Sequence, residues 1–101
     1  MVHYEKFKGI SYNTVIRNNM RKGGKINKFD IIIDNNIRIV TIETDYANGL
    51  SISKEKLFYK QDILQTWTIQ FNNQKKPKLV FSRKEYNKLI QAKKQRVKEI
   101  V

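Results

Sequence analysis

Apolar and polar residues alternate over much of residues 25–81, and a period of two is typical of half-buried β-strands. The alternation is strongest over residues 63–71. The apolar residues predicted to share one face of this strand are Ile63, Trp67, Ile69 and Phe71. The polar residues predicted on its other face are Thr66, Thr68 and Gln70. We therefore expect a strand with one buried and one polar face.

Two further runs rich in β-branched residues, Lys28 to Asp34 and Ile37 to Thr44, predict a hairpin. They meet at two asparagines, residues 35 and 36, which tolerate the positive φ angles of a type I′ turn. The second run places apolar residues on both faces, Ile37 and Ile39 on one and Val40 and Ile42 on the other. We expect this strand to be covered on each side, by a helix or by a partner subunit.

A helix is predicted from Tyr12 to Lys22, with Ser11 as its N-cap and a Gly-Gly pair at residues 23 and 24 as its stop signal. Its predicted buried stripe is Tyr12, Val15, Ile16 and Met20. Its predicted outer face is Thr14, Arg17 and Arg21, with Asn18 near the edge.

A second helix is predicted to follow a capping box at residues 82–85, in which Ser82 and Glu85 bond each other's backbone, and to end near Ile100. Its apolar stripe is Tyr86, Leu89, Ile90, Val97 and Ile100, interrupted by Lys93. A polar loop over residues 72–77 and a short strand over residues 78–81 precede it.

Between the hairpin and the strongest strand, residues 45–49 read as a turn that is tightest at Asn48 and Gly49. Residues 50–62 remain open between two readings, a short helix capped by Ser53 and an additional strand. The chain is short enough for one domain, residues 1–101. The expected fold is α+β: an antiparallel sheet of about four strands, an N-terminal helix and a long basic C-terminal helix.

The composition supports a packed core, since 40% of the residues are hydrophobic. The chain has no cysteine, so disulfides, cysteine-ligated zinc and thiol catalysis are excluded. Its one histidine, His3, lies beside the terminus and gives weak support to a histidine base or metal ligand. No apolar run reaches the roughly 18 residues of a membrane span. We expect a cytoplasmic protein with no cofactor, metal, membrane or small-molecule substrate.

The net charge of +12 is the strongest indication of a partner, because self-repulsion of this size is relieved by a polyanion. Residues 1–50 contribute +3 and residues 51–101 contribute +9. Abundant Lys, Ile, Asn and Tyr, which have AT-rich codons, suggest a low-GC bacterium or its mobile element, a phage or conjugative plasmid.

The basic tract from Lys75 to Lys98 holds ten Lys or Arg residues and one acid, Glu85. Lys84 and Lys88 are like charges four residues apart, which destabilises an isolated helix by about 0.2–0.5 kcal/mol. A bound polyanion reverses that sign, so the tract predicts phosphate contacts. The alternative is a solvated helix face in a lysine-rich proteome.

The segment S-Y-N-T-V-I-R at residues 11–17, followed by Gly-Gly and a hairpin, resembles the recognition helix and wing of winged-helix DNA-binding proteins. This resemblance covers about a third of the chain. It implies that Thr14, Arg17, Asn18 and Arg21 face the major groove of DNA. An ordinary amphipathic helix packed on a sheet is the alternative.

Residues 28–101 are similar in outline to small dimeric single-strand-binding domains of the transcription-coactivator type, which have four antiparallel strands followed by a helix. The resemblance implies that the polar face of the sheet grips the nucleic acid. The residues expected on that face are Thr66, Thr68, Gln70 and Arg38. Tyr46 and Tyr59, near turns, are free to stack on bases, whereas Trp67 is expected in the core.

Four acids on the hairpin, Asp30, Asp34, Glu43 and Asp45, raise the alternative of a Mg²⁺-dependent nuclease. However, Asp34 and Asp45 flank turns where aspartate bonds the local backbone, and no Glu-x-Lys follows at nuclease spacing. We therefore expect no enzyme and no catalytic residue.

These observations favour a small homodimeric DNA-binding protein, and DNA is preferred over RNA as its partner. We expect it to act as a winged-helix-like accessory or regulatory factor. The residues expected to contact nucleic acid are Thr14, Arg17, Asn18, Arg21, Lys25, Lys28, Arg38, Lys75, Lys76, Lys78, Arg83, Lys84, Lys88, Lys94 and Lys98. The alternatives are a phage- or plasmid-encoded protein that binds and inhibits an acidic host protein and, third, an RNA-binding protein or ribonuclease toxin.

Overall fold

The computed structural model describes residues 8–100, and the side chains of residues 8–92. Its elements in chain order are α2 (Tyr12–Arg21), β1 (Lys25–Asp34), β2 (Ile37–Asp45), β3 (Ile52–Lys60), β4 (Ile63–Phe71), β5 (Lys78–Ser82) and α3 (Arg83–Ile100). The α+β class is confirmed. The sheet has five strands instead of about four, because the segment left open by the sequence contains strand β3.

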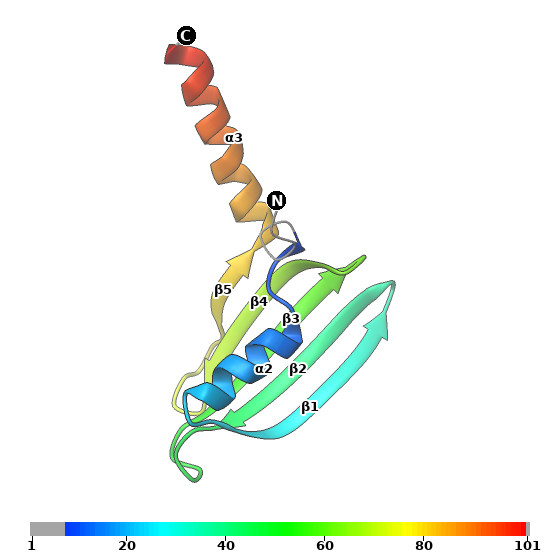
Figure 1. Ribbon diagram of the computed structural model, residues 1–101, viewed down its shortest axis with the longest axis vertical. Coiled ribbons are helices and arrows are strands. Elements are labelled where there is room, and N and C mark those ends of the chain that lie inside the picture. Colours follow the sequence, from blue (N-terminus) through cyan, green and yellow to red (C-terminus); the bar gives the residue numbers. More distant parts are fainter. Residues whose placement is uncertain (1–7, 101) are drawn as a thin grey trace.

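The sheet is an antiparallel meander in which every strand pairs with its neighbour in sequence, from β1 to β5 (Figure 1). At the β1–β2 turn Asn35 and Asn36 have φ angles of 49° and 65°, which confirms the predicted turn. Gln61 and Asp62, with φ angles of 51° and 62°, make a second left-handed turn between β3 and β4.

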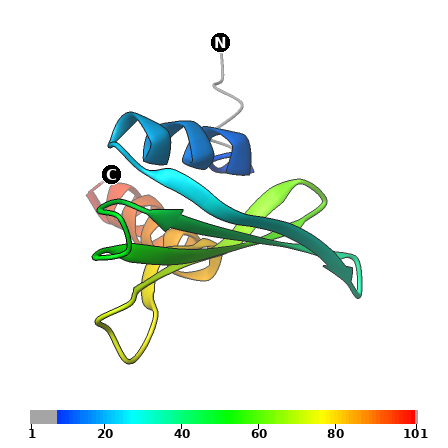
Figure 2. The same cartoon turned by 90° about the horizontal axis from the view of Figure 1, so that it is seen from below.

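Helix α2 lies on one face of the sheet (Figure 2). It begins where predicted, since the Ser11 hydroxyl accepts a hydrogen bond from the backbone N–H of Thr14 at 3.2 Å. Its buried Val15 joins a core contributed by the facing strands. The other core residues are Val40, Ile42, Leu57, Tyr59 and Leu64.

The predicted buried stripe of α2 is wrong at its last position. Met20 is 57% exposed, whereas Asn19, one turn after Val15, is buried. Asn19 is accepted inside because its amide donates to two buried oxygen atoms, those of Thr44 and Glu55.

The predicted face of Ile63 is also wrong. Tyr59 pairs with Leu64 but Phe58 pairs with Thr66, so β4 carries one extra residue at this point. This bulge reverses the alternation, and Leu64 enters the core while Ile63 pairs with Lys60 on the other face.

That other face, called here the open face, has no helix over it in the part of the chain that the structure describes. Ile37 and Ile39 of β2 lie on it and are half-buried. Among the described residues no helix covers this side of β2, and cover by a partner subunit stays a prediction.

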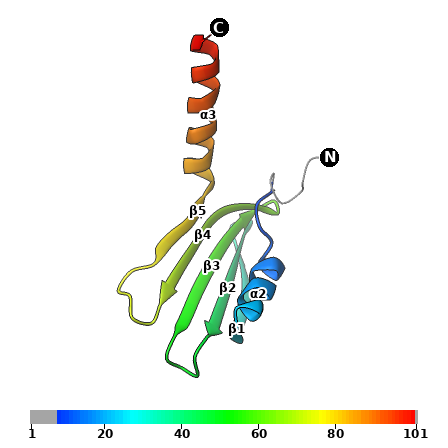
Figure 3. The same cartoon turned by 60° about the vertical axis from the view of Figure 1, so that its left-hand side comes forward.

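Helix α3 continues from β5 and extends away from the sheet (Figures 1 and 3). The Ser82 hydroxyl accepts from the Glu85 N–H at 3.4 Å, which is half of the predicted capping box. The Glu85 carboxylate instead lies 3.7 Å from Lys88 Nζ. Leu89 is 64% exposed and Tyr86 is also exposed, so the described part of the stripe is largely unburied. The side chains of Lys93, Val97 and Ile100 lie outside the described residues.

Candidate nucleic-acid interface

Helix α2 leaves part of its own face of the sheet uncovered, over β4 and β5 (Figures 1 and 3). Two adjoining cavities occupy this region, an inner cavity of about 470 Å³ and an outer cavity of about 560 Å³. They share Trp67 and Val80, and we call the two together the β4–β5 groove.

The inner cavity lies between the second half of α2 and the sheet. Its lining residues are Val15, Asn18, Asn19, Lys22, Tyr46, Ser51, Glu55, Trp67, Ile69, Phe71 and Val80. The outer cavity lies toward the start of α3. Its lining residues are Gly9, Ile10, Leu64, Trp67, Val80, Phe81, Arg83 and Tyr86.

A buried carboxylate lies in the inner cavity. Glu55 is 2% exposed, because the alternation of β3 points it to the same face as Leu57. Its Oε1 accepts from Asn19 Nδ2 at 2.7 Å, and its Oε2 accepts from Trp67 Nε1 at 2.8 Å. Asn19 Nδ2 also donates to Thr44 Oγ1 at 3.1 Å. These donors offset the cost of burying the carboxylate.

Tyr46 lines the same cavity from the loop between β2 and β3. Burial raises the pKa of its hydroxyl above 10.0, and the negative charge of Glu55 raises this pKa further. The loop is fixed by Asp45, whose Oδ1 accepts from the backbone N–H groups of Ala47 at 3.1 Å and Gly49 at 2.8 Å. The local turn role predicted for Asp45 is confirmed.

A guanidinium group forms part of the outer cavity. Arg83 Nε donates to the Leu64 carbonyl at 3.1 Å, and its Cζ lies 5.0 Å from the Phe81 ring centroid and 5.6 Å from that of Tyr86. Arg83 Nη2 is buried and has no hydrogen-bond partner. An anion reaching this cavity would meet an unsatisfied, charged donor.

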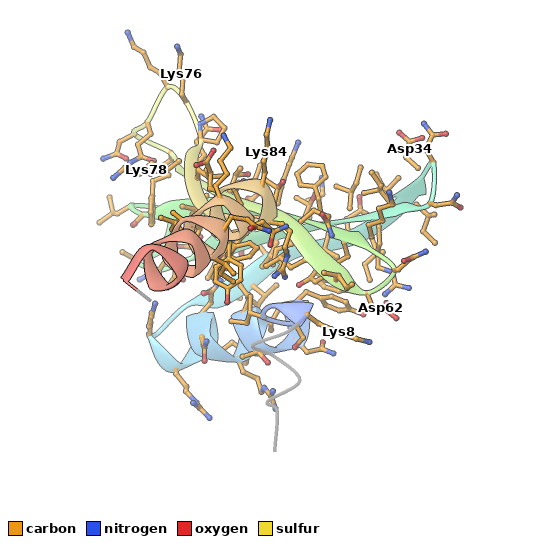
Figure 4. The ribbon with its side chains drawn as sticks, turned by 90° about the horizontal axis from the view of Figure 1, so that it is seen from above. Lys8, Asp34, Asp62, Lys76, Lys78 and Lys84 are labelled. Atoms are coloured by element: carbon orange, nitrogen blue, oxygen red, sulfur yellow. The ribbon has the colours of Figure 1, made fainter. Side chains whose placement is uncertain are left out.

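Two of the predicted contact residues line the groove, Asn18 in the inner cavity and Arg83 in the outer one. Lys78 begins the edge strand β5 and pairs with Ile69, a lining residue. Lys76, in the β4–β5 loop, and Lys84, at the start of α3, lie beside β5 and point away from α2 (Figure 4). The lysines of the tract at positions 76, 78 and 84 therefore lie around β5 and do not share one face.

The other predicted residues are dispersed. On α2, Arg17 and Arg21 are exposed, whereas Thr14 is half-buried and its hydroxyl contacts Ser11 at 2.9 Å and Arg17 Nη2 at 3.3 Å. The remaining exposed ones are Lys25 and Lys28 on β1, Lys75 in the β4–β5 loop and Lys88 on α3. The side chains of Lys94 and Lys98 lie outside the described residues.

The polar face expected of the sheet is confirmed in part. Thr66 and Thr68 of β4 pair with Phe58 and Lys56 and lie on the open face. Arg38 is wrongly assigned to it, because it pairs with Tyr59, a core residue of the α2 side. On the α2 side, Arg38 Nη1 lies 3.2 Å from Asp62 Oδ1.

Sequence reasoning missed most of the inner cavity. Lys22, Tyr46, Glu55 and Phe71 were not foreseen together, because Glu55 falls in the segment whose structure was left open. The signal was present once β3 is read as a strand, since Glu55 alternates with exposed lysines. Trp67 packs against the core as predicted, yet it also lines both cavities.

The four hairpin acids do not form a metal site in the described chain. Among the described residues, no group of three or more His, Cys, Asp or Glu side chains is placed to hold a metal ion. Neither described helix has the length and apolar character needed to cross a membrane.

Comparison with protein-family models, curated proteins and solved structures gives no match to this chain. The winged-helix resemblance does not extend to the observed architecture. The hairpin after α2 forms two strands of the sheet on which α2 packs, and Asn18 lines the groove. The second resemblance matches in part, because residues 28–101 contain five strands before α3 instead of the four of that plan.

Proposed function

We propose that this chain is a small, non-enzymatic DNA-binding protein that holds single-stranded DNA in the β4–β5 groove. The observation that supports this most is the combination of aromatic rings and cationic groups along one uncovered strip of the sheet. The aromatic residues of the groove are Tyr46, Trp67, Phe71, Phe81 and Tyr86. Bases stack on such rings with about 1–3 kcal/mol per base.

Charge around the groove favours a polyanion. Lys22 borders the inner cavity and Arg83 the outer one, and Glu55 is the one acid among the described lining residues. Lys78, which pairs with the lining residue Ile69, adds a cation at the β5 edge, whereas Lys76 and Lys84 lie beside β5 and point away from α2 (Figure 4). In this arrangement the bases stack on the aromatic rings of the groove, and the phosphates contact the cations along the β5 edge.

A single strand suits this arrangement better than a duplex. Stacking on a groove wall needs exposed faces of unpaired bases, which a duplex keeps within its own stack. The expected ranking is single-stranded DNA above duplex DNA, with RNA of the same sequence as the direct comparison.

The test uses the one tryptophan of the chain, Trp67, as a reporter inside the groove. Titrating the protein with a fluorescein-labelled 15-nucleotide single strand, its duplex and the matching RNA gives affinity by anisotropy. The same titration with unlabelled strand is expected to quench the tryptophan emission. Repeating it at several NaCl concentrations counts phosphate contacts, at a slope of about −0.7 per contact on a single strand.

Two lysine variants separate the groove from general charge. Lys78→Ala removes a cation of the β5 edge and is expected to weaken binding and make the salt slope shallower by about 0.7. Lys60→Ala removes an equal charge from the open face, where Lys60 is exposed, and is expected to leave the slope unchanged. Equal effects of the two variants, or binding without tryptophan quenching, would contradict the groove as the binding site.

The same proposal includes a homodimer, joined through the edge strand β1. Phe29 and Ile31 are exposed on this strand, and Ile33 is 72% exposed. An exposed apolar edge strand is a template for pairing with another strand. If β1 pairs antiparallel with a second β1 and Ile31 faces its own copy, Phe29 faces Ile33, and Lys28 faces Asp34 of opposite charge.

Cross-linking tests this register cleanly because the chain has no cysteine. Ile31→Cys is expected to form a disulfide-linked dimer on mild oxidation. Asp34→Cys, on the same strand but opposite Lys28, is the matched control and is expected to remain uncross-linked. Equal cross-linking of both variants, or sedimentation as a monomer at high concentration, would rule out this interface.

A further inference from the structure

The two donor side chains that contact Glu55 in the inner cavity, those of Asn19 and Trp67, have no N–H left for a ligand. Both hydrogens of Asn19 Nδ2 are used, toward Thr44 Oγ1 and Glu55 Oε1. The single N–H of Trp67 is used toward Glu55 Oε2. Each Glu55 oxygen accepts one hydrogen bond and keeps capacity for another. This part of the cavity therefore offers acceptors to a ligand.

The charge of Glu55 strengthens this asymmetry. No Lys or Arg among the described side chains forms an ion pair with Glu55, although Glu55 is only 2% exposed. A buried carboxylate held by neutral donors gains from any further N–H directed at it. A ligand edge placed against Glu55 is therefore selected for N–H donors.

The walls select a flat ring. The rings of Trp67, Phe71 and Tyr46 and the aliphatic Ile69 and Val80 line the inner cavity around that carboxylate. Its volume of about 470 Å³ falls in the range of small-ligand pockets. Proteins read an extruded base in this way, by stacking on its faces and hydrogen bonds to its Watson–Crick edge.

We infer that the inner cavity is a base pocket selective for an amino-bearing base, guanine above all, read by the Glu55 carboxylate. This inference rests on the proposed single-strand binding and adds its base preference. Guanine presents N1–H and N2–H side by side, which matches the two oxygens of one carboxylate. Cytosine and adenine offer one amino group beside a ring acceptor. Thymine presents its N3–H between two carbonyl oxygens, which the carboxylate repels.

The test changes the ligand and keeps the protein intact. Unlabelled 15-nucleotide competitors displace labelled oligothymidylate from the wild-type chain. The competitors are all-thymidine, or thymidine with one central guanosine, deoxyinosine or cytidine. The guanosine strand is expected to compete about tenfold more strongly than all-thymidine, the usual effect of one bidentate base contact. Deoxyinosine lacks the N2 amino group and is expected to lose most of that gain.

A protein variant provides the second arm. Glu55→Gln replaces one acceptor oxygen by an amino group and is expected to abolish the guanosine preference while oligothymidylate still binds. Glu43→Gln makes the same exchange at a carboxylate on the open face, where Glu43 pairs with Lys54, and as the matched control it is expected to keep the preference. If Glu55→Gln does not fold, the deoxyinosine comparison on the wild-type chain decides.

The outcomes are distinguishable. Equal competition by all four strands overturns the base pocket and leaves single-strand binding in place. No binding of any strand overturns both proposals. If the deoxyinosine strand competes as strongly as the guanosine strand, the N2 amino group contributes nothing to binding. That result also overturns the proposal that Glu55 recognises guanine.

Discussion

Asn19→Ala is the substitution whose effect on stability follows most directly from the structure. Asn19 is 6% exposed and donates from Nδ2 to Glu55 Oε1 at 2.7 Å and to Thr44 Oγ1 at 3.1 Å. Alanine removes both donors and leaves the two oxygens buried. The variant therefore keeps the backbone of α2 and removes the polar link between this helix and the sheet.

The magnitude follows from the two hydrogen bonds. The bond to the carboxylate is worth about 1.5–3 kcal/mol and the bond to the hydroxyl about 0.5–1.5 kcal/mol. Alanine returns roughly 0.5 kcal/mol through its higher helix propensity. The expected loss in the free energy of unfolding is about 1.5–4 kcal/mol, a large fraction of the 5–15 kcal/mol typical of small domains.

Urea unfolding followed by circular dichroism at pH 7 measures this loss. The neighbouring Asn18 provides the control, since it lies on the same helix, is half-exposed and makes no side-chain hydrogen bond in the described structure. Asn18→Ala has the same propensity gain and is expected to be neutral or slightly stabilising. If the two alanine variants unfold at the same urea concentration, the buried hydrogen bonds contribute nothing and the reasoning fails.

Two further predictions concern the core and the turn after α2. Burial is the main cause that raises the pKa of Tyr59 above 10.0, and the neighbouring Tyr12 raises it further. The unfolded chain therefore loses the Tyr59 hydroxyl proton at a lower pH than the folded chain, and the free energy of unfolding falls as the pH rises beyond 10. Tyr59→Phe loses the hydrogen bond to the Ile10 carbonyl, about 0.5–1.5 kcal/mol at pH 8, but urea titrations above pH 10 should show a shallower decline than wild type. A Cβ added at Gly24 would lie 2.7 Å from the Asn19 carbonyl oxygen, so Gly24→Ala should cost about 1–3 kcal/mol by thermal unfolding. Gly23→Asn is its control, because Gly23 has open space around it and a substitution there costs only the backbone strain of a φ of 90°, which Asn tolerates better than most residues. A larger loss at Gly23 than at Gly24 would contradict the steric account.

Local signals made most of the fold predictable. The Ser11 cap and the paired asparagines of the first hairpin act through a few neighbouring residues, so their outcome needs no knowledge of tertiary contacts. Strand β4 was bounded correctly because its alternation is strong. These features fixed the class of fold before any long-range contact was considered.

The errors arise where a single residue changes the phase of a pattern. The bulge in β4 moves Leu64 into the core in place of Ile63, and periodicity alone does not reveal it. The burial of Asn19 in place of Met20 depends on Glu55, which is 36 residues away in sequence. The burial of a polar residue can be predicted only when its hydrogen-bond partners are identified, and those partners are set by the tertiary structure.

The candidate site was the least predictable part. Counting charges located the basic tract in the sequence, but it did not show where the lysines of the tract lie relative to β5. It also gave no weight to Glu55, which is an acid in a basic chain. The groove exists because one helix of ten residues covers less than the full width of five strands. Such a mismatch of widths is a property of the assembled layers.

The meander also determines how the chain folds. Each strand pairs with the next, and two of the connections are two-residue turns, so the sheet closes only short loops as it forms. The link from Asn19 to Glu55 spans 36 residues and requires β3 to be in place. We therefore expect helix docking to follow sheet formation, so that loss of this link accelerates unfolding and leaves the folding rate nearly unchanged.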